Sequence, residues 1–224
     1  MNKNIISVEG NIGVGKTTFV NLLLSNIENC SCVKEPIDLW TSITDEGGCN
    51  ILQLYYNDTK RWGYTFQNLA CISRMISMEE HIKNNDSKYI FLDRSLETDK
   101  YIFEKILHES NDISSIEHKL YNMWFDFYSK YVRNLNNNLI IYLRCSTETA
   151  VNRIKKRGRE EEKNIPFEYL EKITQCHEEW LNTNIDLKNN NILIIDCNKD
   201  FENNVEYQNE IIESVRHKIN EYFK

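Results

Sequence analysis

The sequence is constrained most strongly by the eight residues from Gly10 to Thr17, which read G-N-I-G-V-G-K-T. They match the pattern G-x-x-x-x-G-K-[ST] at every required position, between a predicted strand and a predicted helix. Glycines here let backbone N–H groups curl around a polyphosphate, and the helix N-terminus adds partial positive charge. The full match and its context favour a phosphate-binding P-loop over a chance glycine-rich turn.

Two side chains of this loop are expected to bind the ligand together with the backbone N–H groups. Lys16 can reach the β- and γ-phosphates of ATP, and the hydroxyl of Thr17 can ligate Mg²⁺. ATP and Mg²⁺ are therefore the expected cofactors. The residues expected to bind them are Gly10, Asn11, Ile12, Gly13, Val14, Gly15, Lys16, Thr17 and Thr18.

Short apolar runs alternate with longer segments of helical periodicity along the chain. Strands are expected at Ile5–Val8, Cys32–Lys34, Tyr89–Leu92, Leu139–Leu143 and Ile192–Ile195. Helices are expected at Thr17–Leu24, Asn50–Asn57, Trp62–Ile82, Asp99–His108, Ile116–Val132, Thr147–Lys156, Phe167–Asp186 and Val205–Phe223. This alternation predicts an α/β fold of the P-loop NTPase type, with a five-stranded parallel sheet and helices on both faces. We expect one domain over residues 1–224.

The composition limits which cellular compartment and which partners are expected for this protein. A formal net charge of −7 argues against binding to nucleic acid, which favours a basic surface. The seven cysteines include no C-x-x-C pair, so neither a metal nor a disulfide framework is expected, and free thiols fit a reducing compartment. No apolar run approaches the roughly 18 residues of a membrane helix, and the expected first strand leaves no room for a signal peptide. A cytoplasmic protein without a membrane partner is predicted.

This sequence lacks the additional motifs that define several classes of P-loop protein. A GTPase needs D-x-x-G and N-K-x-D, but Asp93–Leu96 reads D-R-S-L and Asn198–Phe201 reads N-K-D-F. Oligomeric ATPases carry an apolar run closed by two acidic residues, which this chain does not contain. A small kinase remains.

Charged residues follow the second and third expected strands, at the sheet edge where ligands of such folds bind. Glu35 comes just before Pro36, and Asp93 precedes Arg94. One carboxylate to accept a proton, one near Mg²⁺ and one arginine on the transferring phosphate would suffice for phosphoryl transfer. Either carboxylate could instead simply be solvated.

Two further clusters are candidates for ligand binding. Arg153, Arg157 and Arg159 end a predicted helix and enter a charged turn, which predicts an arginine-rich lid over about residues 153–165 rather than a solvated helix end. The second cluster could stack on a base and pair with its edge, although aromatic residues at helical spacing more often form core. Its members are Tyr55, Tyr56, Trp62, Phe66, Gln67, Arg74 and Asp99.

The order of these motifs resembles the deoxynucleoside kinase family from Ile5 to about Phe201. The matching blocks are EGNIGVGKTT at Glu9–Thr18, KEPIDLW at Lys34–Trp40, NILQLYY at Asn50–Tyr56, FQNLACISR at Phe66–Arg74, DRS at Asp93–Ser95, DKYIF at Asp99–Phe103, RGREEE at Arg157–Glu162, IPFEYL at Ile165–Leu170 and DCNKDF at Asp196–Phe201. The resemblance implies transfer of phosphate from ATP to the 5′-hydroxyl of a deoxynucleoside, by a homodimer.

The resemblance also implies roles for individual residues. Glu35 would be the general base, Arg94 would hold the 5′-oxygen and phosphate, and Tyr56 with Glu162 would bind the 3′-hydroxyl. Tyr56 would also exclude ribose, and Gln67 would read the base. Pocket walls would be Trp40, Tyr55, Phe66 and Phe103; the lid would use Arg153, Arg157 and Arg159; and the ATP base would contact Lys199, Asp200 and Phe201.

Three questions stay open at this point. Asp93 stands where animal relatives have glutamate, so it could ligate Mg²⁺ or share the base role with Glu35, which we favour as base. Arg74 and Asp99 correspond to a pair beside the base, which predicts a preference for amino-bearing bases over thymine unless the pair is a remote structural salt bridge. The alternative functions are a thymidylate or other nucleoside monophosphate kinase, and a non-catalytic nucleotide-binding module.

Overall fold

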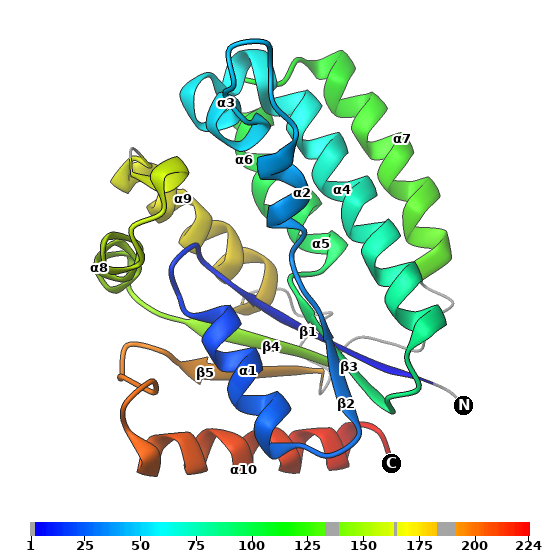
Figure 1. Ribbon diagram of the computed structural model, residues 1–224, viewed down its shortest axis with the longest axis vertical. Helices are drawn as coiled ribbons and strands as arrows, with labels where there is room; N and C mark the ends of the chain where they lie inside the picture. Colours follow the sequence, from blue (N-terminus) through cyan, green and yellow to red (C-terminus); the bar gives the residue numbers. More distant parts are fainter. Residues whose placement is uncertain (1–2, 133–138, 164, 183–190) are drawn as a thin grey trace.

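The computed structural model describes residues 3–132, 139–163, 165–182 and 191–224. At its centre is a five-stranded sheet in the order β2-β3-β1-β4-β5, in which all neighbouring strands are parallel (Figure 1). The strands are β1 (Asn4–Gly10), β2 (Cys30–Val33), β3 (Tyr89–Asp93), β4 (Leu139–Arg144) and β5 (Ile192–Asp196). The predicted α/β fold with a parallel five-stranded sheet is confirmed.

Helices cover both faces of the sheet, which explains why its strands are continuous apolar runs. The α-helices are α1 (Lys16–Asn26), α2 (Ile37–Ser42), α3 (Ile51–Asn57), α4 (Thr59–Asn84), α5 (Leu96–Thr98), α6 (Lys105–Glu109), α7 (Ser115–Val132), α8 (Thr147–Arg157), α9 (Phe167–His177) and α10 (Val205–Tyr222). A 3₁₀ turn at Glu160–Glu162 and π-helical turns at Asp99–Glu104 and Glu178–Asn182 complete the described elements.

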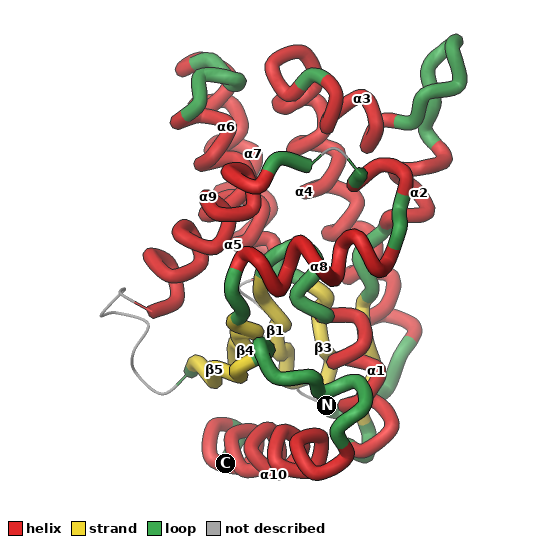
Figure 2. The backbone as a smooth tube through the Cα atoms, turned by 90° about the vertical axis from the view of Figure 1, so that its left-hand side faces the viewer, coloured by secondary structure: helices red, strands yellow, loops and turns green. Residues whose placement is uncertain are grey.

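Alternate residues of the strands point to different cores. On one face, Ile6 and Val8 of β1 pack with α1 and α10. On the other face, Ile5 packs with residues of α4 and α7, while β4 contributes Ile140 to a cluster with α9. Figure 2 shows α3, α4, α6, α7 and α9 gathered at one end of the molecule and α10 at the other, with the sheet between them.

Several expected elements differ from the structure in their bounds or in their type. β2 begins and ends earlier than the expected Cys32–Lys34. The single helix expected at Asp99–His108 is a π-helical turn followed by α6; because π turns are rare, a helical pattern is interpreted as α-helix by default. The helix expected at Phe167–Asp186 is α-helical only to His177, and its last four residues lie outside the described chain. The short helix α2 was not predicted.

Candidate active site

A cavity of about 760 Å³ opens at the carboxyl ends of β1, β2 and β3. Its walls come from the P-loop, the segments after β2, β3 and β5, helices α3 and α4, and the arginine-rich end of α8 with the turn that follows it. This is the edge at which open parallel sheets bind ligands, and the volume is in the range of small-molecule sites.

The P-loop follows β1 directly and wraps one end of this cavity. Gly10 and Gly13 have φ values of 144° and 80°. A Cβ atom would lie 2.5 Å from the Leu143 carbonyl oxygen at Gly10 and 2.6 Å from the Ala150 carbonyl oxygen at Gly13. Both positions therefore require glycine, for conformation and for close packing. The sequence pattern thus has a direct steric cause in the neighbouring strand and helix.

Lys16 is folded back onto its own loop. Its Nζ donates to the carbonyl oxygens of Asn11 at 2.9 Å and Gly10 at 3.2 Å. Burial, and then the nearby Arg94, lower the pKa of Lys16 to about 7. An ammonium group in this environment gains a large stabilisation when a polyanion enters the loop.

Thr17 and Asp93 meet at the mouth of the P-loop. The Thr17 hydroxyl donates to Asp93 Oδ2 at 3.2 Å, whereas Asp93 Oδ1 is buried without a hydrogen-bond partner among the described residues. Burial, followed by repulsion from Glu35, raises the pKa of Asp93. A hydroxyl beside one under-coordinated carboxylate fits Mg²⁺, which is usually held by one or two carboxylates together with substrate phosphates.

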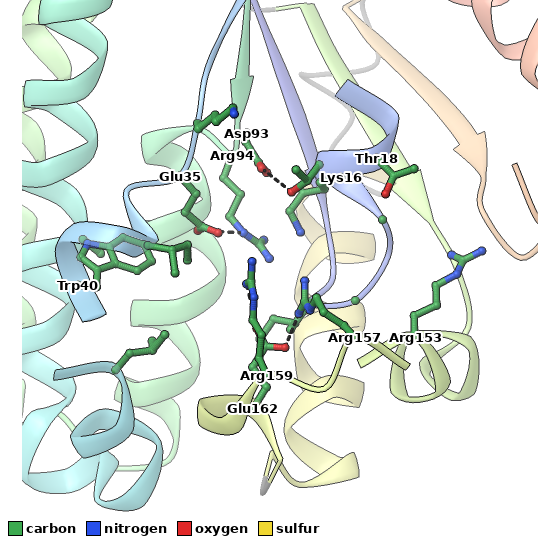
Figure 3. Close-up of a pocket in the computed structure, with 18 of the residues that line it drawn as sticks. Lys16, Thr18, Glu35, Trp40, Asp93, Arg94, Arg153, Arg157, Arg159 and Glu162 are labelled. Carbon is green, nitrogen blue, oxygen red and sulfur yellow. Dashed lines mark hydrogen bonds and ion pairs between the residues drawn. The ribbon is translucent and has the colours of Figure 1, made fainter. Parts of the chain in front are cut away.

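Glu35 lies two residues after β2 and faces two arginines, of which Figure 3 labels Arg94. It forms an ion pair with Arg74, and its Oε1 is 3.4 Å from Nε of Arg94. Burial alone would raise the pKa of Glu35, but Arg74, Arg94 and Lys16 together hold it well below its ordinary value. Glu35 is therefore a carboxylate at neutral pH and can accept a proton.

Arg74 joins the phosphate side of the cavity to its aromatic side. Besides Glu35, it binds Asp99 through Nε at 3.0 Å and the Asp93 carbonyl oxygen through Nη1 at 3.3 Å. Both Arg74 and Asp99 line the cavity. The contact with Glu35 was not foreseen from the sequence, because the two residues are 39 positions apart.

The aromatic side of the cavity is built by α2, α3 and α4. The ring of Phe66 stacks on Tyr55 at 4.6 Å and meets Trp40 edge-on at 5.2 Å. Gln67 is buried beside them, and its Oε1 has no hydrogen-bond partner among the described residues. A flat apolar slot with one free amide oxygen suits a nucleobase that carries a hydrogen-bond donor.

The arginine-rich segment separates into two parts (Figure 3). Arg157 and Arg159 both pair with Glu162, the latter at 3.3 Å, and these residues face the cavity. Arg153 instead donates to the Val14 carbonyl oxygen at 3.0 Å, with its guanidinium 5.7 Å from the ring centroid of Phe201. The three arginines thus reach different regions of the site.

Most residues that the sequence singled out line this one cavity. Exceptions are Gly10, Asn11, Val14, Trp62 and Lys199, which are not among its lining residues. The cavity also has walls that the sequence analysis did not single out, because their side chains carry no distinctive chemical pattern. These are Lys34, Ile37, Asp38, Leu52, Ala70, Lys156 and Glu202.

Comparison with known proteins adds an independent line of support. Residues 6–220 match the family described as "Deoxynucleoside kinase". The chain is 38% identical to deoxycytidine kinase 1 of Xenopus laevis, over 94% of this chain and 88% of that protein. It is 36% identical to the mitochondrial deoxyguanosine kinase of Xenopus laevis, over 89% and 83%. It is 37% identical to human mitochondrial thymidine kinase 2, over 80% and 64%.

Proposed function

The chain belongs to the deoxynucleoside kinase family and phosphorylates deoxynucleosides with ATP, and we propose that it does so with Glu35, Arg94 and Lys16 as the central groups. One observation carries this assignment. Arg94 lies 3.4 Å from Glu35 and donates to the Gly10 carbonyl oxygen at 2.8 Å, so it bridges the carboxylate and the P-loop. A 5′-hydroxyl beside Glu35 would then face a phosphate held by the loop.

Each group has a defined task in this reaction. Glu35 accepts the proton of the 5′-hydroxyl as the oxygen attacks the γ-phosphorus of ATP. Arg94, Lys16 and Arg157 stabilise negative charge on the transferring phosphoryl group. Thr17 and Asp93 would hold Mg²⁺, which supplies further charge neutralisation when it is bound. Arg153 with Lys199, Asp200 and Phe201 would hold the ATP base.

The sugar and the base of the acceptor have their own contacts. Tyr56 and Glu162 both line the cavity and would hold the 3′-hydroxyl, and the bulk of Tyr56 would exclude a 2′-hydroxyl. Gln67 would bind the base edge between Phe66 and the other walls, Trp40, Tyr55 and Phe103.

The test of this function is release of ADP with deoxynucleosides, with deoxynucleoside monophosphates, and with neither. Of these three conditions, only the one with deoxynucleosides should support turnover of ATP. A preference for monophosphates would favour a thymidylate kinase, and no turnover with any acceptor would favour a non-catalytic module. Lys16→Ala should abolish transfer in a folded protein, because its charge is needed most in the transition state. Normal turnover by that variant would refute the P-loop assignment.

We propose further that deoxycytidine, deoxyadenosine and deoxyguanosine are preferred over thymidine. Asp99 can accept a hydrogen bond from an exocyclic amine, whereas a thymine methyl beside a buried ion pair would cost about 1–3 kcal/mol. Arg74 also binds Glu35, so the informative single variant is Asp99→Ala, compared with the pair Arg74→Met and Asp99→Ala. The measurement is kcat/KM for all four deoxynucleosides, and in both variants the value for thymidine should rise relative to the other three. Thymidine as the best substrate of the unsubstituted enzyme would refute this preference.

We also propose one cytoplasmic domain, with a lid at about residues 153–165, that forms a homodimer. All seven cysteines are free thiols, which suits a reducing compartment. Among the described residues, no helix has the length and apolar character needed to cross a membrane. Large apolar side chains are exposed along α7, including Ile116 at 70% and Met123 at 69%, and such a face can be buried against a second copy.

A further inference from the structure

Glu9, the penultimate residue of β1, is a fully buried carboxylate with an exposed fraction of 0%. Its Oε1 accepts the backbone N–H of Ser95 at 3.0 Å, and its Oε2 accepts the hydroxyl of Thr98. Within the described part of the chain, no lysine, arginine or histidine forms an ion pair with it. Burying a carboxylate without a cation costs free energy, and its hydrogen bonds must compensate for the lost solvation.

The group that Glu9 holds is the start of the helix that follows Arg94. Ser95 is the N-cap of α5, and Thr98 is the last residue of that helix. A carboxylate at a helix N-terminus is favoured by the N–H groups and by the helix dipole. Asp99 comes directly after Thr98, so one carboxylate anchors both ends of the short segment between Arg94 and Asp99.

Arg94 itself has an unusual backbone. Its φ of 72° lies in the left-handed region, which non-glycine residues rarely adopt and which the surrounding contacts must maintain. Its N–H donates to the Val8 carbonyl oxygen at 3.2 Å, and its guanidinium donates to the Gly10 carbonyl oxygen at 2.8 Å. Three consecutive residues, Val8, Glu9 and Gly10, therefore hold Arg94 and Ser95 from one side.

We propose that Glu9 is a positioning residue for phosphoryl transfer, which acts by keeping Arg94 in this left-handed conformation. With Ser95 and Thr98 fixed by the carboxylate, the guanidinium of Arg94 remains between Glu35 and the P-loop. Without the hydrogen bonds to Ser95 and Thr98, the segment relaxes toward ordinary φ values and the guanidinium moves away from the transferring phosphate. The inference rests on the role proposed above for Arg94.

Two substitutions of Glu9 separate hydrogen bonding from packing. Glu9→Gln keeps an acceptor for Ser95 and offers an N–H to the Thr98 hydroxyl, so it should retain most of kcat. Glu9→Met has similar volume but accepts neither bond. It should lower kcat by about 10- to 100-fold, as expected for a small displacement of a charge-stabilising group, while KM for ATP and deoxynucleoside stays within about threefold. Unchanged kcat in Glu9→Met would overturn the proposal.

The decisive measurement repeats Glu9→Met in an Arg94→Ala background. If Glu9 acts through Arg94, kcat of the double variant should equal that of Arg94→Ala, because the two effects are coupled. Losses that multiply in full would show a separate structural role and overturn the proposal while leaving the proposed function intact. If Arg94→Ala alone keeps kcat, the assigned role of Arg94 fails and the inference fails with it. Should Glu9→Met not fold, Thr98→Val removes one of the same bonds and enters the same comparison.

Discussion

Four acidic side chains at the edge of the sheet differ in their partners. Glu35 faces two arginines, Asp99 faces one, Asp93 accepts from a hydroxyl, and Glu9 accepts from a backbone N–H and a hydroxyl. Arginine partners hold the pKa of Glu35 low, whereas burial raises the pKa of Asp93 and brings that of Asp99 to about 6. Position, not pKa, favours Glu35 over Asp93 as base: Asp93 is bound by Thr17 beside the P-loop, whereas Glu35 faces the cavity between Arg74 and Arg94.

Glu35→Gln is expected to lower kcat by about 10²–10⁴-fold, because the amide cannot take the proton of the 5′-hydroxyl. KM for ATP should change little, since Glu35 faces the acceptor side. Steady-state kinetics at saturating ATP provide the measurement, with Asp93→Asn as the comparison. Asp93→Asn should instead raise the Mg²⁺ concentration needed for half-maximal rate. A Glu35→Gln enzyme with normal kcat and raised KM for deoxynucleoside would transfer the base role to Asp93.

His177 predicts a pH dependence of stability that is separate from catalysis. Its ring is fully buried and stacks on Tyr142 with centroids 5.7 Å apart, while Nδ1 donates to the Ile173 carbonyl oxygen at 2.7 Å. Burial, with a smaller effect of Arg94, lowers its pKa from 6.5 to about 3. The native state therefore keeps His177 neutral at a pH where the unfolded chain binds a proton.

The direction in which stability changes with pH follows from this difference in proton binding. The stabilisation by neutral His177 is complete above about pH 6.5 and declines as the pH falls toward 3, by about 1.4 kcal/mol per pH unit. Urea unfolding at pH 7 and pH 5 should show the decline in the unsubstituted protein and a smaller decline in His177→Gln. His217→Gln, at an exposed histidine, is the control and should behave like the unsubstituted chain. Equal declines in all three would contradict the prediction.

At the scale of elements, the segment proposed as a lid contacts two parts of the site. Glu162 of the 3₁₀ turn forms ion pairs with Arg157 and Arg159. The adjacent Glu161 accepts a hydrogen bond of 3.1 Å from Nδ2 of Asn50, which is the N-cap of α3. The lid therefore contacts the helix that carries Tyr55 and Tyr56. Closure of the lid and organisation of the sugar pocket are expected to be linked through these contacts.

Arg157→Ala should lower kcat much more than it weakens deoxynucleoside binding. The removed guanidinium would act on charge that develops in the transition state, while Glu162 keeps Arg159 as a partner. Lys155→Ala is the matched control, because Lys155 is an exposed cation of the same helix that does not line the cavity. Transient kinetics should separate kcat from the dissociation constant of deoxynucleoside. Equal losses in both would argue against a lid that acts on the transition state.

The elements were predictable to different degrees. The strands followed from buried apolar runs, and the P-loop from a pattern with a steric cause at Gly10 and Gly13. Helix α2 did not, since its six residues are too few to show a period. The left-handed Arg94 and its contacts with β1 could not be predicted either, because they depend on tertiary packing between β1 and the segment after β3.

At the scale of the whole molecule, helices α4 and α7 lie side by side on the outer side of the helical layer (Figure 1). Ile116, Leu120, Met123 and Trp124 are exposed on α7 at spacings of three and four residues, so they form a stripe along one side of the helix. Exposed Ile72 and Ile76 add apolar surface on α4. A stripe of this kind is self-complementary about a twofold axis, which is the usual symmetry of homodimers.

Met123→Glu is expected to convert the proposed homodimer to a monomer, because two facing carboxylates would be buried in an apolar interface. His217→Glu, at an exposed residue of α10 at the opposite end of the molecule from α7, is the control and should leave the dimer intact. Light scattering coupled to size-exclusion chromatography provides the mass, and circular dichroism confirms that the variants fold. The cavity lies between the sheet and α3–α4, so a folded monomer should keep its P-loop site and bind ATP. An unsubstituted protein that elutes as a monomer at micromolar concentration would refute the dimer, and a dimeric Met123→Glu would place the interface elsewhere.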